Sequence, residues 1–196
     1  MFNEIIFVDE TLSNTEPYLG GNPYLPTTIV WPTDSEGRPL LHLATFPAAF
    51  INKYVPINLE TQLVVSIFTP YSKTSDTYIE TSMTEGGKVI AYRPAIKQVS
   101  GYKDSIISPK KIISIENSRE DSDENGLAKI GGIPSWLQDD ESSESLSYIL
   151  QINNSRLNKA YPDHKSILIG GIGYLLLKKN ILKEDLSAGK FLIQTS

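Results

Sequence analysis

Cysteine is absent from this 196-residue chain, and histidine and tryptophan each occur only twice. Without cysteine the protein has no zinc–thiolate site, iron–sulfur cluster or thiol nucleophile. The two histidines, His42 and His164, lie in no pattern that supplies both a nucleophile and an orienting acid. The chain also has neither a Gly-x-Ser-x-Gly elbow nor a Gly-Lys-Ser/Thr phosphate loop. These absences favour a non-catalytic protein, and we expect no catalytic residue, metal site or cofactor.

Long apolar runs and basic clusters are also missing. No stretch approaches the roughly 20 apolar residues that a membrane-spanning helix needs. The first residues lack the basic and apolar regions of a signal peptide. The net charge of −5 argues against nucleic-acid binding, which requires clustered lysine and arginine. We therefore expect a cytoplasmic protein that binds neither nucleic acid nor a membrane.

The negative charge is concentrated in one part of the chain, residues 116–145, which we call the acidic zone. It contains nine carboxylates against Arg119 and Lys129, a net charge of −7, so the remainder carries +2 within the total of −5. A concentrated negative charge can steer a basic partner, whereas a solvated linker is the alternative interpretation. The candidate partner-binding residues of the zone are Asp121, Asp123, Glu124, Asp139, Asp140 and Glu141.

One phrase occurs twice. Leu19-Gly20-Gly21-Asn22-Pro23 returns as Ile130-Gly131-Gly132-Ile133-Pro134, 111 positions later, and similar apolar runs follow each copy. A solenoid would repeat every ~20–50 residues and at least three times. The pattern instead predicts a single domain over residues 1–196 with an internal duplication. We place the first half at about 1–115, the second at about 125–196, and an acidic linker at 116–126.

Short apolar runs dominate, and helical periodicity is scarce. Six of the twelve prolines lie within residues 23–56, which excludes long helices there. Helices are expected at 44–53 and 178–186, a turn at 34–37, and a hairpin loop at 85–87. We predict an α+β fold with a mostly antiparallel β-sheet, built from two pseudo-symmetric halves. Runs of β-branched and aromatic residues predict strands at 5–8, 28–31, 63–68, 78–81, 89–92, 111–115, 148–152, 167–169, 173–177 and 191–195.

Phrases along nearly the whole chain resemble the YwqG-like bacterial family, a domain of unknown function. They are Gly20-Gly21-x-Pro23-x-Leu25-Pro26, Trp31-Pro32, Asp34-Ser35-x-Gly37-x-Pro39-Leu40, Lys129-Ile130-Gly131-Gly132-x-Pro134, Leu150-Gln151-Ile152 and Gly189-Lys190-Phe191-Leu192-Ile193-Gln194. The chain departs from the family at two places. The family's aromatic-Leu-Ala-Gln motif is replaced here by Leu41-His42-Leu43-Ala44-Thr45, and its Gly-Asp-Ser-Gly motif by Gly170-Gly171-Ile172-Gly173. The resemblance implies no activity. Members occur near bacterial polymorphic toxins, so it implies an immunity role.

Two further sets of residues are candidate binding sites. Residues 121–126 match the start of an EF-hand loop, but the twelfth position, where calcium needs a carboxylate, is Gly132. We therefore expect no calcium site. The repeated Gly-Gly-x-Pro phrases favour structural turns, because glycine reaches positive φ and proline fixes the exit direction. Alternatively they face each other and line a ligand cleft with Trp31, Trp136 and Gln138.

Two functions fit these observations. The first is a non-enzymatic, cytosolic, immunity-type protein of bacteria, which neutralises a protein partner such as a basic toxin through the acidic zone. The second is a small-ligand-binding protein, or a weak hydrolase, that uses the cleft between the two halves. Whether any activity exists stays open, and the residues favour the non-enzymatic interpretation.

Overall fold

The computed structural model describes residues 1–13, 15–99, 102–124 and 126–196, and β-strands dominate this part of the chain. The strands are β1 (Phe2–Val8), β2 (Tyr18–Leu19), β3 (Leu41–Pro47), β4 (Asn58–Leu59), β5 (Val64–Thr69), β6 (Gly87–Tyr92), β7 (Lys110–Asn117), β8 (Lys129–Ile130), β9 (Leu146–Asn153), β10 (Ile172–Lys178), β11 (Asn180–Ile181) and β12 (Asp185–Gln194). The helices are α1 (Ala48–Tyr54), α2 (Tyr78–Thr84), α3 (Asn154–Ala160) and the 3-10 helix η1 (Pro162–His164). The prediction of a mostly antiparallel α+β fold with few short helices is confirmed.

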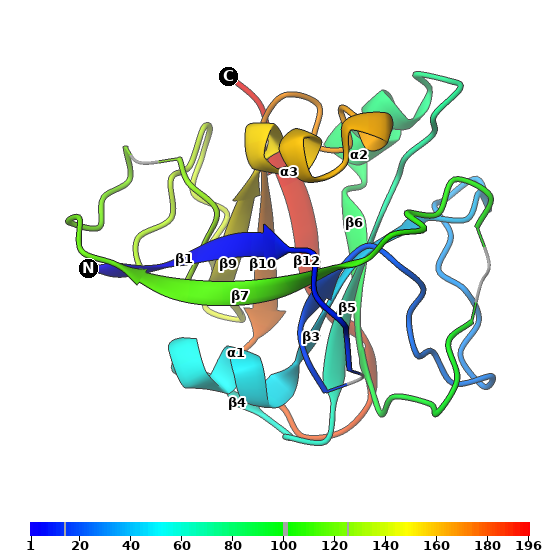
Figure 1. Ribbon diagram of the computed structural model, residues 1–196, viewed down its shortest axis with the longest axis horizontal. Helices are drawn as coiled ribbons and strands as arrows, with labels where there is room; N and C mark the ends of the chain where they lie inside the picture. Colours follow the sequence, from blue (N-terminus) through cyan, green and yellow to red (C-terminus); the bar gives the residue numbers. More distant parts are fainter. Residues whose placement is uncertain (14, 100–101, 125) are drawn as a thin grey trace.

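Most of the strands close into a barrel (Figure 1). The order of neighbouring strands is β1-β7-β2-β3-β5-β6-β12-β10-β9-β8, and β8 pairs with β1 to complete the ring. The pairings within the ring are antiparallel. Outside the ring, β4 and β11 form a short parallel pair. Closure leaves the ring without a free edge for unwanted pairing.

Each of the two repeated Gly-Gly-x-Pro motifs follows a strand that lies next to the β1–β7 pair, one on either side. From the β1–β7 pair, one side runs β7-β2-β3-β5-β6 and the other runs β1-β8-β9-β10-β12. Gly20 follows β2 and donates its N–H to the Leu43 carbonyl at 2.6 Å, while Gly131 follows β8 and donates to the Ile149 carbonyl at 2.7 Å. Both glycines have positive φ, 72° and 66°. The two phrases therefore form turns of the same kind.

The interior of the barrel is apolar, and loops cover much of its outer surface. Val65 and Ile67 of β5 belong to one continuous core cluster that includes residues from most of the strands. Their neighbours Val64 and Phe68 belong to a second cluster, which packs against Trp31. This division follows the alternation of side chains along a strand. Because both faces are covered, β5 is buried along its whole length.

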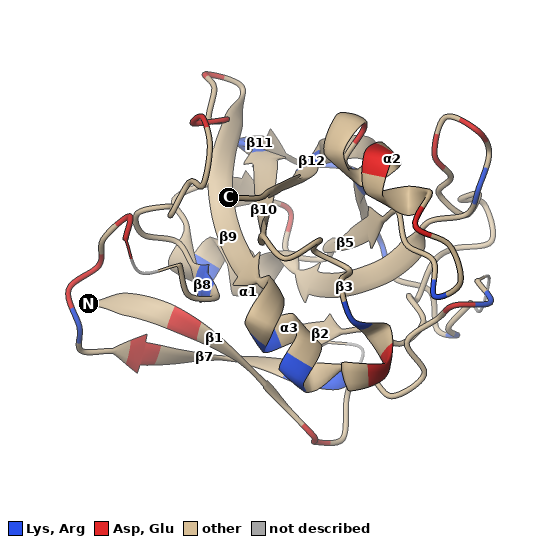
Figure 2. Cartoon of the chain, turned by 90° about the horizontal axis from the view of Figure 1, so that it is seen from above, with Lys and Arg blue, Asp and Glu red and all other residues tan. Residues whose placement is uncertain are grey.

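Two short helices close the ends of the barrel. In Figure 1, α1 and α3 lie at opposite ends, and in Figure 2 both lie over the middle of the ring of strands. Each has seven residues, too few for an isolated helix to be stable, so buried contacts hold them in place. Those contacts come from Ala48 and Ile51 of α1 and Leu157 of α3. Among the described helices, none is long and apolar enough to cross a membrane.

Two of the expected elements have the opposite secondary structure. Residues 78–81, expected as a strand, begin α2, whose buried side chains Tyr78, Thr81 and Ser82 share one helical face. Residues 85–87 are consequently no hairpin loop, because they lead from α2 into β6. Residues 178–186, expected as a helix, contain the end of β10, all of β11 and the start of β12. Packing against the rest of the fold overrides local preference in both places.

Other expectations differ in extent. The helix expected at 44–53 starts only at Ala48, because β3 continues through Pro47. Residues 28–31 and 167–169 lie outside the strands. In the second of these segments Ile169 has a φ of 52°, and its N–H donates to the Ser166 carbonyl in a turn. The turn at 34–37 is confirmed by a hydrogen bond from the Gly37 N–H to the Asp34 carbonyl at 3.1 Å.

Candidate functional site

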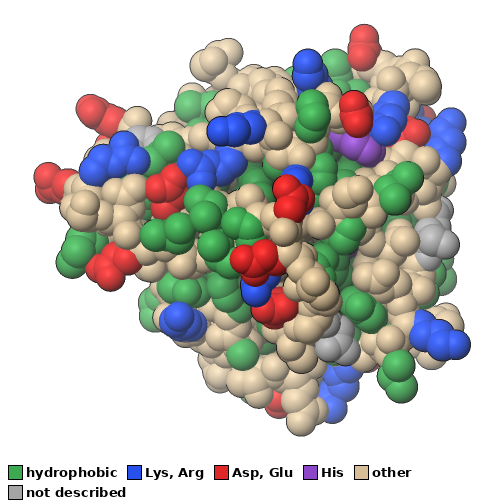
Figure 3. Space-filling view, viewed as in Figure 1, with side chains coloured by type: hydrophobic (Ala, Val, Ile, Leu, Met, Phe, Trp, Pro, Cys, Tyr) green, Lys and Arg blue, Asp and Glu red, His purple; other side chains and the backbone are tan. Residues whose placement is uncertain are grey.

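The face of the molecule that carries β1, β7 and α3 has mixed charge. Figure 3 shows lysine, arginine and carboxylate side chains interspersed over this face. A hollow of about 600 Å³ lies here, lined in part by Lys110 and Arg156. Lys110 pairs with Asp9, and Arg156 pairs with Glu4 at 2.6 Å. Carboxylates therefore neutralise these two cations, and Lys159 is a third cation on the lining.

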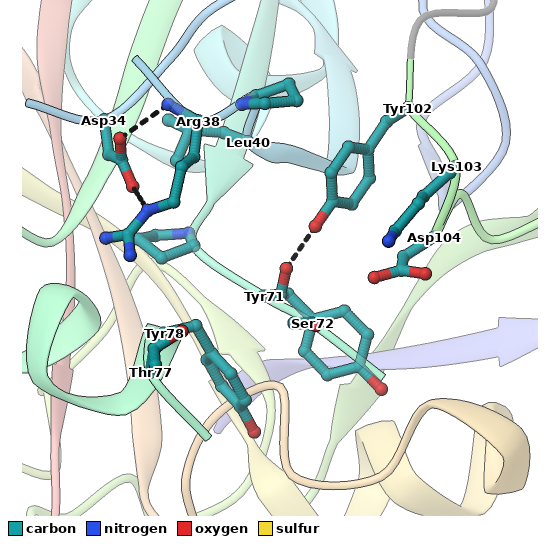
Figure 4. A pocket seen from close by; sticks show the side chains of 12 residues that line it. Asp34, Arg38, Leu40, Tyr71, Ser72, Thr77, Tyr78, Tyr102, Lys103 and Asp104 are labelled. Carbon is teal, nitrogen blue, oxygen red and sulfur yellow. Dashed lines mark hydrogen bonds and ion pairs between the residues drawn. The ribbon is translucent and has the colours of Figure 1, made fainter. Parts of the chain in front are cut away.

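A second cavity, which we call the tyrosine pocket, has a volume of about 430 Å³ and three tyrosines in its walls (Figure 4). It lies where the turn after residue 33, the exit of β5, the start of α2 and residues 102–104 meet. Its volume falls within the ~300–1,000 Å³ of ordinary small-molecule sites. The lining residues are Asp34, Arg38, Pro39, Leu40, Pro70, Tyr71, Ser72, Thr77, Tyr78, Tyr102, Lys103 and Asp104.

Three tyrosines form the walls of the pocket, and hydrogen bonds hold their rings in place. Tyr71 follows Pro70 out of β5, and its ring meets that of Tyr78 edge-on at 5.2 Å between centroids. The hydroxyl of Tyr78 donates to the Ser166 carbonyl at 3.0 Å. The Tyr102 hydroxyl donates to the Tyr71 carbonyl. The aromatic walls are therefore fixed by contacts from distant parts of the chain.

The tyrosines remain protonated over the physiological pH range. Burial, together with nearby Tyr78 and Asp104, raises the pKa of Tyr71 to about 12. Burial and the Asp104 carboxylate raise the pKa of Tyr102 to about 12 as well. Burial also raises the pKa of Tyr78. None of these three phenols is thus poised to act as a general base near neutral pH.

An ion pair builds one side of the pocket. Asp34 accepts a hydrogen bond from Arg38 Nε at 2.6 Å and from the Arg38 backbone N–H at 2.8 Å. Burial acts to raise the pKa of Asp34, but these hydrogen bonds outweigh it and the pKa is lowered. Arg38 also donates to Thr81 Oγ1 at 2.8 Å, which joins the turn to α2. The Arg38 guanidinium is thus largely used in holding the pocket together.

The opposite side carries one buried and one exposed charge. Asp104 is only 7% exposed, and its Oδ2 accepts the Lys73 backbone N–H at 3.2 Å. Lys103, next to it in the chain, is exposed. Figure 4 shows the Asp104 carboxylate on the same side of the pocket as Tyr71 and Tyr102. A buried carboxylate acts across a medium of low dielectric, while water screens the exposed ammonium.

The arrangement is suited to binding more than to catalysis. Among the described residues of the lining, the hydroxyls besides the tyrosines come from Ser72 and Thr77, and no histidine is there to activate them. His164 lies behind Tyr71, with ring centroids 5.8 Å apart, and is buried. Burial lowers the pKa of His164, so the ring is neutral near pH 7. Rigid aromatic walls and few polar groups are typical of binding sites.

His42 belongs to a buried polar network outside the barrel. Its Nδ1 lies 3.0 Å from the Gly21 carbonyl, and its Nε2 lies 2.8 Å from Thr45 Oγ1. Thr45 Oγ1 continues to Ser66 Oγ at 2.6 Å, and Ser66 to the Tyr92 hydroxyl at 2.8 Å. Burial lowers the pKa of His42 to about 4. The network is closed to solvent and fixes the first Gly-Gly turn to the barrel.

The acidic zone consists of residues in different environments. Asp121 is mostly buried and pairs with the fully buried Lys129 at 2.7 Å, while it also accepts the Ile133 N–H at 2.7 Å. Glu141 pairs with Lys190 at 3.3 Å. The side chains of the other four candidates are exposed; these are Asp123, Glu124, Asp139 and Asp140. Figure 2 shows two separate acidic loops, one beyond the start of β9 and one beside the N-terminus.

The calcium-like loop does not form a cluster of ligands in the described part of the chain. Asp121 is used by Lys129, and Asn125 lies outside the described residues. Gly132, at the twelfth position, is close enough to Asp121 that an added Cβ would lie 2.2 Å from its Oδ2. No group of three or more potential metal-ligating side chains occurs among the described residues.

The residues expected to line a cleft between the halves lie in two separate places. Trp31 packs edge-on against Phe68, with ring centroids 5.4 Å apart. Trp136 stacks near Tyr174 at 4.5 Å in a different cluster. Gln138 lies near Trp136 and donates to the Thr195 carbonyl at 3.0 Å. Both tryptophans are half-buried. The structure therefore does not bring Trp31 together with Trp136 and Gln138.

Sequence analysis missed the tyrosine pocket because no motif marks it. Tyr71 and Tyr78 are seven positions apart and Tyr102 follows 24 positions after Tyr78, with no regular spacing, and residues 78–81 were expected as a strand. The phrases Pro70-Tyr71-Ser72 and Tyr102-Lys103-Asp104 carry the available signal, since each places a tyrosine beside turn-forming or charged residues. In comparisons with known proteins, no family model and no curated protein matched the chain.

Proposed function

We propose that the chain is a non-enzymatic binding protein that holds a ligand in the tyrosine pocket. The observation that carries this proposal is the set of three aromatic walls, Tyr71, Tyr78 and Tyr102, fixed around a cavity of about 430 Å³. Tyrosine offers a large apolar surface with one polar atom and loses little entropy on binding. Few other groups on the lining are suited to chemistry, so recognition is the simplest use of the cavity.

The position of the pocket in the ring supports a specialised role. We infer, from the repeated phrases and the matching series of strands, that the barrel consists of two duplicated halves related by pseudo-symmetry. Between β5 and β6 the chain inserts residues 70–86, whereas residues 179–184 join β10 and β12. The tyrosine pocket is built largely from residues 70–86 and 93–109. It is thus an addition to one half and not part of the shared framework.

A pocket-filling substitution tests this function. Thr77 is exposed and lines the pocket, so Thr77→Trp should fill it without disturbing the core. In a screen of cationic, neutral and anionic fragments, we expect at least one class to raise the melting temperature of the wild-type protein, since a ligand that binds only the folded state stabilises it. The same fragments should leave the melting temperature of Thr77→Trp unchanged.

Thr61→Trp is the matched control, because Thr61 is also exposed but lies far from the pocket lining. The control should respond to fragments as the wild type does. Equal responses of the wild type and Thr77→Trp would place binding elsewhere. No response to any class would remove the proposed function.

A second candidate function is the immunity-type role, in which the acidic zone neutralises a basic toxin in the bacterial cytoplasm. Exposed Asp139 and Asp140 support it, since they lie on a loop that extends beyond the start of β9. The resemblance to the YwqG-like family stays a prediction that supports it as well. Reversing Asp139, Asp140 and Glu141 to lysine should slow association with such a toxin at low salt. Unchanged association rates would exclude this loop from the interface.

A further inference from the structure

The tyrosine hydroxyls of the pocket have little capacity left to donate hydrogen bonds to a ligand. A tyrosine hydroxyl has one proton to donate and lone pairs that accept. Tyr78 donates its proton to the Ser166 carbonyl and Tyr102 donates to the Tyr71 carbonyl. The Tyr71 hydroxyl points to the Lys165 carbonyl at 3.5 Å. The hydroxyl protons of Tyr78 and Tyr102 are therefore used within the protein, and what these walls offer a ligand is chiefly the aromatic ring surface.

The most buried charges on the pocket lining are the carboxylates Asp34 and Asp104. Asp104 is a buried carboxylate, and its negative charge is a cause of the raised pKa of both Tyr71 and Tyr102. On the other side of the pocket, Arg38 is neutralised by Asp34 at 2.6 Å and by Glu36 at 2.9 Å. The remaining cation, Lys103, is exposed and screened by water.

We propose that the tyrosine pocket binds an organic cation that carries N–H donors, a primary ammonium or a guanidinium, through the Asp104 carboxylate and the three tyrosine rings. This inference rests on the proposed function, because it names the chemical class of the ligand for the same pocket. Such cations have donors for each free acceptor and gain from the ring faces. An anion would meet the buried Asp104 carboxylate, and a neutral ligand would leave that carboxylate without a counter-charge.

The test compares three probes of similar size by NMR titration or calorimetry. These are n-butylammonium, butan-1-ol and butanoate. We expect n-butylammonium to bind at least about tenfold more tightly than butan-1-ol, since a hydrogen bond to a charged group strengthens binding by that order. Butanoate should bind most weakly. N-acetyl-lysine methylamide, measured beside n-butylammonium, distinguishes the source, because tighter binding of the peptide-like probe indicates a side chain of a protein partner.

Two substitutions of opposite effect test the role of charge. Asp104→Asn should weaken n-butylammonium binding about tenfold and leave butan-1-ol unaffected. Lys103→Glu should strengthen n-butylammonium binding several-fold, because it replaces an ammonium on the lining, which repels the ligand's ammonium, with a carboxylate that attracts it. Asp76→Asn is the control for loss of one carboxylate close to α2 but off the pocket lining, and should change binding less than twofold.

The possible results separate this inference from the proposed function. If butanoate binds as tightly as n-butylammonium, the ligand class is wrong while the pocket remains a binding site. If Asp104→Asn fails to fold, Lys103→Glu still tests the role of charge. Unchanged n-butylammonium affinity in Lys103→Glu contradicts the inference. If no probe of any charge binds the wild-type protein, both the ligand class and the binding function are wrong.

Discussion

Asp121 and Asp123 are two positions apart in the acidic zone and lie in opposite environments. Asp121 is the counter-ion of Lys129, whose side chain is fully buried beneath it. Lys129 also donates to the Ser122 carbonyl at 3.0 Å and lies over the ring of Phe2 at 5.4 Å. Asp123 is exposed. At this scale, the environment of a carboxylate decides its role, and Asp121 is a structural residue.

Asp121→Ala is therefore expected to cost about 3–5 kcal/mol of unfolding free energy, because it removes a carboxylate that pairs with a buried ammonium. Asp123→Ala removes the same charge from the surface and should change stability by less than about 0.5 kcal/mol. Urea unfolding of both variants measures the difference. Similar stabilities would mean that the Lys129–Asp121 pair is not a structural ion pair.

The buried His42 predicts a dependence of stability on pH. Its pKa is 6.5 in the unfolded chain and about 4 in the folded protein. Between these values the unfolded chain takes up a proton that the folded protein does not. The stability that neutral His42 contributes is thus complete above pH 6.5 and is lost as the pH falls towards 4. The difference corresponds to roughly 3 kcal/mol.

Unfolding of the wild type and of His42→Gln at pH 7 and pH 4.5 checks this expectation. The variant should be less stable at pH 7, since it disturbs the contacts to Gly21 and Thr45, but it should lose less stability on acidification. His164, whose pKa is also lowered by burial, contributes in the same direction in both proteins. Equal losses would show that His42 does not control the acid sensitivity.

At the scale of elements, the Gly-Gly turns connect the barrel to its coverings. The Leu19 carbonyl, just before the first turn, accepts the Tyr161 hydroxyl at 2.6 Å from the segment after α3. The chain passes so close that a Cβ on Gly20 would lie 2.5 Å from Ile106 Cγ2 and 2.8 Å from the Tyr161 hydroxyl. Glycine is needed here both for the positive φ and for the space.

Gly20→Ala should consequently destabilise the protein by about 3–4 kcal/mol, the sum of backbone strain and overpacking. Gly37 has a φ of 79° with no atom within 4 Å of an added Cβ, so Gly37→Ala isolates the backbone cost of about 1–2 kcal/mol. Thermal unfolding compares the two. A larger effect for Gly37→Ala would contradict the close packing around the first turn.

The strands could be predicted where they coincide with continuous apolar runs in the sequence. Runs such as 63–68 and 173–177 are continuous and apolar because both faces of β5 and β10 are covered. The first turn of α2 resembles a strand in composition, since Tyr78 and Ile79 have high β-propensity. Its helical state follows from contacts with β12 and with the turn at Ser166, which no local pattern reveals.

At the scale of the whole molecule, closure of the barrel joins segments that are far apart in the sequence. The N-terminal β1 pairs with β8, and β6 pairs with the C-terminal β12. Sequence analysis predicted the antiparallel strands but not the barrel, since closure depends on pairings such as Phe2 with Asn117. The tyrosine pocket could not be predicted from the sequence for the same reason, because residues near 34, 71 and 103 meet only in the folded chain.

These pairings between distant strands predict how fragments of the chain behave. Cleavage within residues 118–120 should leave the barrel intact, because β1 with β8 and β6 with β12 still hold the pieces together. Fragments 1–119 and 120–196 should each be unfolded alone, since each leaves strand edges unpaired. Circular dichroism of each fragment and of their mixture measures this. A folded isolated fragment would contradict the interdependence of the two pieces.

The central claim, that the tyrosine pocket is the binding site, is tested most directly by mapping a ligand onto the protein. The measurement is a two-dimensional ¹H–¹⁵N NMR titration of the wild-type chain with n-butylammonium. The account predicts saturable shifts at the backbone amides of Tyr71, Tyr78, Tyr102 and Asp104, with little change elsewhere. Shifts confined to the loop that carries Asp139 and Asp140, or no saturable shift at all, would contradict it.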